Sequence, residues 1–315
     1  MTKDFPRDEV RAAIATIHEK LGGGCSKQVA ERVRRWMETL VPSGEAADYF
    51  LQPSMFPMLL LPAWMSRSVA EPWEQGFQSD LVYSSVNAYY SIRLLDNVMD
   101  GHETCEKGLL PLSAFFHAEF QSVYQRYFGS SDRFWCSFHS LWLETADAVV
   151  REAQLQHVDF EGFREITARK LSAAKIPLVA VHLHFGGRTD LAQWLAFCDE
   201  LAAWWQFLDD LMDWYIDQQR GACTYFLCEA ERRKKVGEPV LQWVLREGFL
   251  WGVDTLELWL ESLRHMAGEI GSHDAVSFLE QRGGMLIETA RSLLPAMQAL
   301  EEVAVAMGSD VGLQH

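Results

Sequence analysis

The chain has 315 residues, of which 49% are hydrophobic and 12% aromatic, and its 28 basic and 44 acidic residues give a net charge of −16. This apolar content is ample for a large core and excludes a disordered chain. Because the negative charge repels phosphate groups, neither nucleic acid nor an anionic lipid surface is expected as a partner.

Targeting signals are not evident in the sequence. The opening segment MTKDFPRDEVRAAIATIHEK carries acidic residues and lacks the apolar run and cleavage site of a secretory signal peptide. The uncharged stretch 52–66 is too short to span a bilayer and contains three prolines. We therefore expect a cytoplasmic protein without a transmembrane segment. The six cysteines show no Cys-x-x-Cys spacing typical of zinc or redox sites, so we expect buried free thiols.

Apolar residues recur at helical spacing through almost every long segment. Helices are predicted over 8–20 and 26–41, separated by three glycines, with Ser26 as the cap of the second. A third should run from 78 to 100 and end near Gly101. Further helices are expected over 111–128, 132–156, 159–185, 189–218, 238–264 and 273–307, with a turn over 186–190. The predicted fold class is all-α, with one domain over 1–315.

Two aspartates close the third predicted helix. Asp96 and Asp100 are four residues apart, which places both side chains on one face of a helix, one turn apart. Two solvated acids at a helix end are an equally good interpretation of this pair alone.

A second set of aspartates lies in an apolar stretch of the 189–218 helix: Asp209, Asp210, Asp213 and Asp217. At about 100° per residue their side chains span an arc of roughly 100°, one narrow stripe. Like charges crowded among tryptophans and leucines are costly unless cations compensate them. Mg²⁺ prefers oxygen ligands and binds through a few carboxylates together with substrate phosphates. The two sets together favour a magnesium site over a solvated helix face.

Other metal centres fit the sequence poorly. A di-iron carboxylate bundle needs Glu-x-x-His pairs, and no Glu is followed three residues later by His. His182 and His184 have no spacing typical of transition-metal ligands.

The first aspartate pair lies in a segment with a family resemblance. YSIRLLDNVMDG, residues 90–101, resembles the first aspartate motif of squalene and phytoene synthases, in which an Arg precedes DxxxD by three residues. The matching residues are Arg93, Asp96 and Asp100. Asn97 stands where many prenyl synthases have a second Asp, so an aspartate at that position is expected to be tolerated.

The second set resembles two versions of the second motif of the same superfamily. In QFLDDLMDWYIDQQRGACTY, residues 206–225, DDLMD is similar to the DDxxD of trans-prenyl diphosphate synthases, where Gln and Phe also precede it. DWYID followed by Arg-Gly is similar to squalene and phytoene synthases. DNVMD and DDLMD also resemble motifs of moenomycin-type prenyltransferases. Two such motifs about 110 residues apart are a specific signal for the class I isoprenoid synthase superfamily.

The resemblance implies a single-domain helical bundle with a central apolar cavity, where Asp96 and Asp209 project toward each other across the mouth. It implies an allylic prenyl diphosphate substrate and three Mg²⁺ ions that hold the diphosphate. The implied metal ligands are Asp96, Asp100, Asp209, Asp210, Asp213 and Asp217, and the carboxylates of Asp96, Asp100, Asp209 and Asp213 are expected to be catalytic. Metals would neutralise the leaving diphosphate, so that the allylic carbon–oxygen bond ionises. A homodimer is left open.

Basic and aromatic residues complete the predicted site. Arg93 lies one turn before Asp96, Lys170 lies about forty residues before the second motif, and Arg220 follows it, so all three are expected to bind the diphosphate. Aromatic rings attract a carbocation in a site without water. The expected substrate-binding rings are those of Tyr89, Trp205 and Phe207.

The sequence departs from the patterns of several members of the superfamily, and these departures restrict which reactions are expected. Chain-elongating prenyl synthases carry a basic GGKxxRP-like segment before the first motif and an Arg pair after it. Here QPSMFPMLLLPAW and GHETCEKGLLP lack those residues. The NxxxSxxxE motif and terminal Arg-Tyr pair of typical terpene cyclases are also missing. We favour an atypical terpene synthase that cyclises or rearranges one prenyl diphosphate. The alternatives are a prenyltransferase, including head-to-head coupling, and a non-catalytic partner subunit of a prenyl synthase.

Overall fold

The computed structural model describes the chain over residues 6–41, 44–52, 54–69, 74–99 and 107–310, with side chains described as far as Glu302. Across these ranges the chain is α-helical and forms no β-strand, which confirms the predicted all-α fold class. Within the same ranges, none of the helices is both long and apolar enough to cross a membrane. The expected cytoplasmic location stays a prediction.

The helices belong to two compact units, each with its own core. Unit 1 comprises Met1–Leu141 and Ala173–Leu191, and unit 2 comprises Trp142–Ser172 and Ala192–His315. Helix α7 (Arg133–Glu152) begins in unit 1 and ends in unit 2. The predicted single domain over 1–315 stays a prediction.

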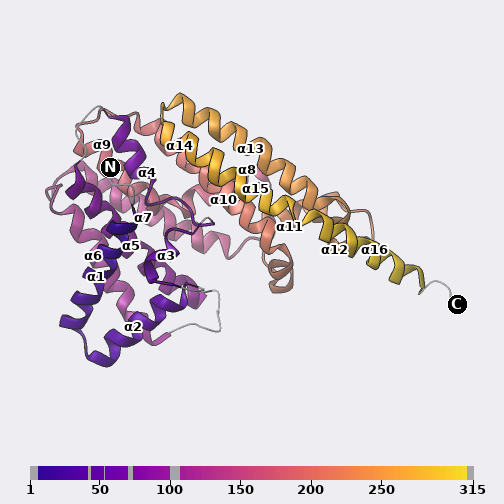
Figure 1. Ribbon diagram of the computed structural model, residues 1–315, viewed down its shortest axis with the longest axis horizontal. Helices are drawn as coiled ribbons and strands as arrows, with labels where there is room; N and C mark the ends of the chain where they lie inside the picture. Colours follow the sequence, from indigo (N-terminus) through magenta and orange to yellow (C-terminus); the bar gives the residue numbers. More distant parts are fainter. Residues whose placement is uncertain (1–5, 42–43, 53, 70–73, 100–106, 311–315) are drawn as a thin grey trace. The chain divides into compact units, whose positions relative to one another are not determined.

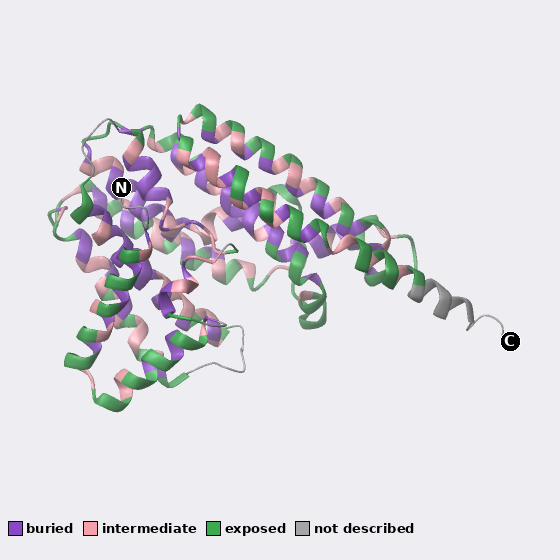
Figure 2. Ribbon diagram, in the orientation of Figure 1, coloured by how far each residue is buried: buried purple, intermediate pink, exposed green. Residues whose placement is uncertain are grey.

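Unit 1 is built around one long helix. Its elements, labelled in Figure 1, are α1 (Arg7–Gly24), α2 (Lys27–Thr39), α3 (Ala46–Tyr49), α4 (Leu61–Ser68), α5 (Gln75–Met99), the 3-10 turn η1 (Lys107–Leu109), α6 (Pro111–Tyr124), the start of α7, and α9 (Ile176–His184). Helix α5 packs mainly against α6 and α1. Val82, Val86, Tyr90 and Leu94 recur every four residues along it and are all buried. This spacing places an apolar stripe of α5 in the core. Figure 2 colours the buried parts of the ribbon purple.

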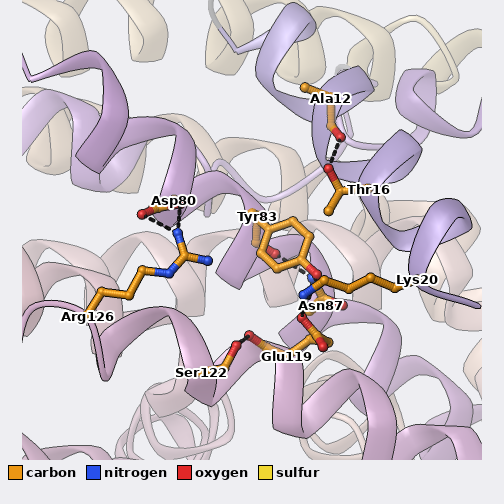
Figure 3. A network of polar contacts seen from close by, with 9 residues as sticks. All are labelled: Ala12, Thr16, Lys20, Asp80, Tyr83, Asn87, Glu119, Ser122 and Arg126. Atoms are coloured by element: carbon orange, nitrogen blue, oxygen red, sulfur yellow. Dashed lines mark hydrogen bonds and ion pairs between the residues drawn. The ribbon is translucent and has the colours of Figure 1, made fainter. Parts of the chain in front are cut away.

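A polar network joins α1, α5 and α6 (Figure 3). Lys20 forms an ion pair with Glu119 and its Nζ lies 5.4 Å from the centre of the Tyr83 ring. The Tyr83 hydroxyl donates to Glu119 Oε2 at 2.7 Å, and Arg126 pairs with Asp80 at 2.8 Å. Lys20, Tyr83, Asp80 and Arg126 line a hollow of about 300 Å³. The network therefore ties the three helices together at a solvent-facing seam.

Unit 2 carries the longest helix of the described chain, α10 (Leu191–Arg220). Its other elements are the end of α7, α8 (Phe160–Lys170), α11 (Tyr225–Arg233), α12 (Val240–Trp243), the π-turn η3 (Val244–Gly248), α13 (Phe249–Glu269), α14 (His273–Phe278), the π-turn η4 (Leu279–Gly283), α15 (Gly284–Arg291) and α16 (Leu294–Asp310). The 3-10 turn η2 (Ser172–Lys175) follows α8. The π-turns interrupt two otherwise continuous helical stretches.

Helices α10 and α13 lie in close contact. Trp204 Nε1 donates a hydrogen bond to the Leu256 carbonyl oxygen at 2.9 Å, and both side chains are fully buried. Gly252 allows the close approach, because a Cβ there would lie 2.5 Å from Cδ1 of Leu211. A methyl group cannot occupy that space without displacing Leu211. This packing fixes the helix that carries the second aspartate motif.

Several helix boundaries agree with the sequence. Ser26 caps α2, with its Oγ accepting the Val29 N–H at 3.4 Å. Gly186 and Gly187 adopt φ values of 65° and 79° in the predicted turn over 186–190. The expected end of a helix at Gly101 lies outside the described residues.

Other boundaries were predicted wrongly. Helix α1 runs through the three glycines to Gly24. The burial of Ile14, Ile17 and Leu21 on one face of the helix outweighs the poor helix propensity of the glycines. The single helix expected over 159–185 is broken, because Pro177, in the first turn of α9, has no N–H to continue a helix from the preceding turn. The sequence analysis also missed α3, α4 and α11.

Candidate active site

In unit 1, the last turns of α5 carry the first aspartate motif. Arg93 Nη1 donates to Asp96 Oδ2 at 2.9 Å, and the two side chains are 32% and 37% exposed. The i,i+3 spacing brings these groups together on one face of the helix. Both are therefore open to a ligand while bonded to each other. Asp100 lies outside the described residues.

The aromatic residues beside Arg93 form a packed cluster. The hydroxyls of Tyr89 and Tyr49 are hydrogen-bonded and their rings are 5.0 Å apart. Tyr89 also packs edge-on against Phe50 and Tyr90, at 5.2 and 5.7 Å. Burial, followed by the Tyr49 hydroxyl, raises the pKa of Tyr89. Tyr89 is thus a neutral, half-buried ring one turn before Arg93, and its contact with substrate stays a prediction.

Asn97 does not share the exposure of its neighbour Asp96. Its side chain is buried on α5, with 5% of its surface exposed. An aspartate at this position would bring a charge into the core of unit 1. The burial argues against the expectation that Asp would be tolerated there, which stays a prediction.

In unit 2, the second motif lies near the end of α10. Asp209 and Asp213 are exposed and Asp217 is half-buried, with i,i+4 spacing from one to the next. Asp210, in contrast, is buried with 4% exposure. Three of the four acids therefore form the expected open stripe, and the fourth faces inward.

The charges of this stripe interact. Burial and then the negative charges of Asp213 and Asp209 raise the pKa of Asp217 to about 6, against a smaller opposite effect of Arg220. Repulsion of this kind arises where several carboxylates share a small region. The role of the stripe as a metal site stays a prediction.

Asp210 is held by its own helix. Gln206 Nε2 donates to Asp210 Oδ1 at 2.9 Å. Burial raises the pKa of Asp210 to about 7, the Gln206 hydrogen bond lowers it, and the charges of Asp209 and Asp217 raise it further. The carboxyl group therefore changes its protonation state near neutral pH. Its role as a metal ligand stays a prediction.

Lys170, at the end of α8, lies near the second motif. Its Nζ pairs with Glu152 Oε2 at 2.7 Å, and both side chains are 32% exposed. Its positive charge lowers the pKa of Asp210, so the two groups are within electrostatic reach. Unit 2 thus brings together Lys170 and the aspartates of α10. Arg220 is exposed and close enough to Asp217 to lower its pKa.

Two rings expected to bind substrate are deeply buried in unit 2. Trp205 is 8% exposed and stacks on Phe278 at 6.1 Å. Phe207 is fully buried, between the rings of Phe163 at 6.3 Å and Tyr225 at 5.7 Å. These are surroundings of core residues, and substrate binding by either ring stays a prediction.

The sequence analysis missed residues that surround Asp210. Gln206, Glu152 and Tyr225 line a small hollow of about 50 Å³ together with Asp210. The one available signal was the i,i+4 spacing of Gln206 and Asp210 on the predicted helix. Glu152 and Tyr225 come from distant segments and carry no such signal.

The carboxylates of α10 are oxygen ligands of the kind that Mg²⁺ prefers. In the described part of the chain, no three Asp, Glu, His or Cys side chains are arranged to hold a metal ion by themselves. Mg²⁺ does not require such a cage, since it usually keeps several waters and binds one or two carboxylates plus substrate phosphates. Asp209, Asp213 and Asp217 offer carboxylate pairs one turn apart, and burial, followed by the charges of Asp213 and Asp209, raises the Asp217 pKa. The residues therefore fit a diphosphate-bound Mg²⁺.

Comparison with known proteins supports the fold. No family model matches the chain, and no match is found among curated proteins. Among solved structures, 23 chains match. One is a geranylgeranyl pyrophosphate synthetase from the archaeon Geoglobus acetivorans, with a TM-score of 0.63 and 13% sequence identity over 91% of this chain and 96% of that chain. At this identity the likeness shows a helical fold of the trans-prenyl synthase type.

Proposed function

We propose that the chain is a magnesium-dependent class I terpene synthase, which ionises an allylic prenyl diphosphate and cyclises or rearranges the carbocation. The observation that carries the proposal is the stripe of Asp209, Asp213 and Asp217, which lie one turn apart on the same face of α10; burial, followed by the charges of Asp213 and Asp209, raises the Asp217 pKa. A trans-prenyl synthase-like fold and the first motif at Asp96 support it.

In this proposal the aspartates bind metal and the basic residues bind the diphosphate. Asp96 and Asp100 form one carboxylate set and the aspartates of α10 form the other, and both would hold Mg²⁺. The bound metal would supply Lewis-acid stabilisation of the leaving pyrophosphate. Arg93, Lys170 and Arg220 bind diphosphate oxygens, so Lys170 exchanges its Glu152 partner for a stronger anion.

The chain lacks basic residues that chain elongation would need, and this favours cyclisation. The stretches QPSMFPMLLLPAW and GHETCEKGLLP do not supply the basic residues that bind an isopentenyl diphosphate acceptor in chain-elongating synthases. Without an acceptor, a carbocation can only rearrange, close a ring, lose a proton or meet water. The aromatic content of 12% offers ring faces for the cation.

A prenyltransferase is the second candidate. The observation that favours it is the fold likeness to a geranylgeranyl pyrophosphate synthetase. In that case the same carboxylates and basic residues ionise the allylic substrate, and the prenyl group passes to an acceptor, including a second prenyl diphosphate in head-to-head coupling.

Substrate incubations distinguish these functions. Purified protein is incubated with Mg²⁺ and allylic diphosphates of ten, fifteen, twenty or twenty-five carbons, with and without isopentenyl diphosphate, and pyrophosphate and products are analysed. A terpene synthase gives hydrocarbons or alcohols of unchanged carbon number from one substrate. Products of higher carbon number indicate the prenyltransferase. No pyrophosphate release with any substrate would contradict both and favour a non-catalytic subunit.

A further inference from the structure

Two cysteines lie side by side where α11 begins in unit 2. Cys223 and Cys228 are half-buried, and their Sγ atoms are 3.8 Å apart. Among the other cysteines that the structure describes, Cys198 is buried and Cys136 is exposed. The described cysteines are free thiols, as expected, but the expected burial is confirmed for Cys198 and is wrong for the exposed Cys136 and the half-buried Cys25, Cys223 and Cys228.

The local backbone creates this contact. Thr224 caps α11, with its Oγ1 accepting the Leu227 N–H at 3.3 Å, so Cys223 immediately precedes the cap. Cys228 lies in the first turn, where its N–H bonds to the Thr224 carbonyl oxygen at 3.0 Å. Its Sγ also accepts the Val158 N–H at 3.5 Å. A disulfide has sulfur atoms roughly 2.05 Å apart, so a small movement of the segment before the cap would join them.

We propose that Cys223 and Cys228 are an oxidation site, a dithiol that hydroperoxides convert into an intramolecular disulfide. One thiol, as its thiolate, attacks the peroxide oxygen; the O–O bond breaks, giving a sulfenic acid and water or an alcohol. The second thiol attacks the sulfenic sulfur, an S–S bond forms, the S–O bond breaks and water leaves. The two thiols lose two electrons in all, the peroxide gains them, and both thiol protons end in the released molecules.

The pair rests in the reduced form until an oxidant arrives. Burial, and then the neighbouring Cys228 thiol, raise the pKa of Cys223 to about 11. Cys223 is thus mostly protonated at neutral pH, so the thiolate form that attacks a peroxide is a minor fraction and the pair reacts slowly with other electrophiles. Partial exposure of both residues still admits a small peroxide.

Oxidation of Cys223 and Cys228 would restrain the backbone at the end of α10. The Ala222 N–H donates to the Asp217 carbonyl oxygen at 3.0 Å, and the Gly221 N–H donates to that of Gln218 at 3.2 Å. Cys223 follows Ala222 directly, so closing the disulfide pulls on the segment that terminates the helix. The cross-link therefore restrains both the last turn of α10 and the first turn of α11.

Peptide mass analysis tests the modification. Trypsin releases both cysteines in one peptide, GACTYFLCEAER, residues 221–232. After mild hydrogen peroxide treatment of the reduced full-length protein, this peptide should become lighter by two hydrogen atoms and lose both alkylation sites. Since the two thiols lie side by side, the second thiol should capture the sulfenic acid formed on the first, so this peptide should give the disulfide and not a stable sulfinic acid. The change should reverse with dithiothreitol and be absent in Cys223→Ser and Cys228→Ser, whereas Cys136→Ser should behave as wild type.

Hydrogen exchange tests the restraint independently of any activity. Amides of residues 217–228 should exchange several-fold more slowly in the oxidised wild type than in the reduced protein. Peroxide-treated Cys223→Ser should show no such slowing. A peptide that stays doubly alkylatable while Cys136 is oxidised would overturn the oxidation site. A disulfide that leaves exchange over 217–228 unchanged would overturn its coupling to α10.

Discussion

The buried carboxyl group of Asp210 makes a specific prediction about stability and pH. Its pKa is about 7 in the folded chain, because of burial first of all, against 3.8 for an exposed aspartate. The folded state therefore keeps a proton that the unfolded chain loses near pH 4. Between these two pKa values the folded state binds more protons, so stability falls as pH rises.

The magnitude follows from the size of the shift. One pKa unit corresponds to about 1.4 kcal/mol, so ionised Asp210 costs roughly 4 kcal/mol once the pH exceeds 7. About 2 to 3 kcal/mol of this loss falls between pH 5 and pH 8. Asp210→Asn keeps an acceptor for Gln206 and cannot ionise, so it should remove that part of the pH dependence.

Urea denaturation of the metal-free protein at pH 5 and pH 8 measures the effect. The free energy of unfolding of Asp210→Asn minus that of wild type should be about 2 to 3 kcal/mol larger at pH 8 than at pH 5. Asp147→Asn is a matched control, since Asp147 is an exposed aspartate on α7. Equal pH dependence in wild type and Asp210→Asn would refute the argument that burial raises the pKa of Asp210 to near neutrality.

The remaining predictions concern packing, charge and ligands. Gly252→Ala should destabilise the protein by about 1 to 3 kcal/mol through its clash with Leu211, while Gly268→Ala in the same helix, with nothing within 4 Å of its Cβ, should not; urea denaturation compares them. Asn97→Asp should lower the melting temperature at neutral pH and less so at pH 4, because the charge is buried only when ionised. Lys170→Met should raise the KM for the prenyl diphosphate roughly tenfold in steady-state kinetics, because it removes one charged hydrogen bond to the substrate. Saturating Mg²⁺ with pyrophosphate should raise the wild-type melting temperature, and an unchanged value would contradict the diphosphate site.

Local chemistry explains which parts of the fold could be predicted from the sequence. The cap at Ser26 and the glycine turn at Gly186 and Gly187 depend on a few neighbouring residues, and both were predicted correctly. The end of α1 was not, because it depends on burial of Ile17 and Leu21 against other helices. Periodicity identifies long amphipathic helices and misses the short α3, in which only a single turn is formed.

The same distinction holds for the candidate site. The spacing of Asp209, Asp213 and Asp217 follows from the helix alone, so their common face could be predicted. Asp210 lies at the edge of the same arc, and its burial depends on α8 and the segment before α11, which no local pattern reveals. The burial of Asn97 likewise depends on tertiary packing around α5.

The central claim is that the aspartate stripe of α10 holds Mg²⁺ for ionisation of a prenyl diphosphate. Pyrophosphate release by wild type, Asp213→Asn and Asp147→Asn, measured at several Mg²⁺ concentrations with the best substrate, tests it most directly. Asp213→Asn should lose at least about a hundredfold in turnover, about 2.7 kcal/mol of transition-state stabilisation, with unchanged helicity and melting temperature no lower than wild type. Asp147→Asn should keep full turnover. Full activity of Asp213→Asn at every Mg²⁺ concentration would contradict the claim.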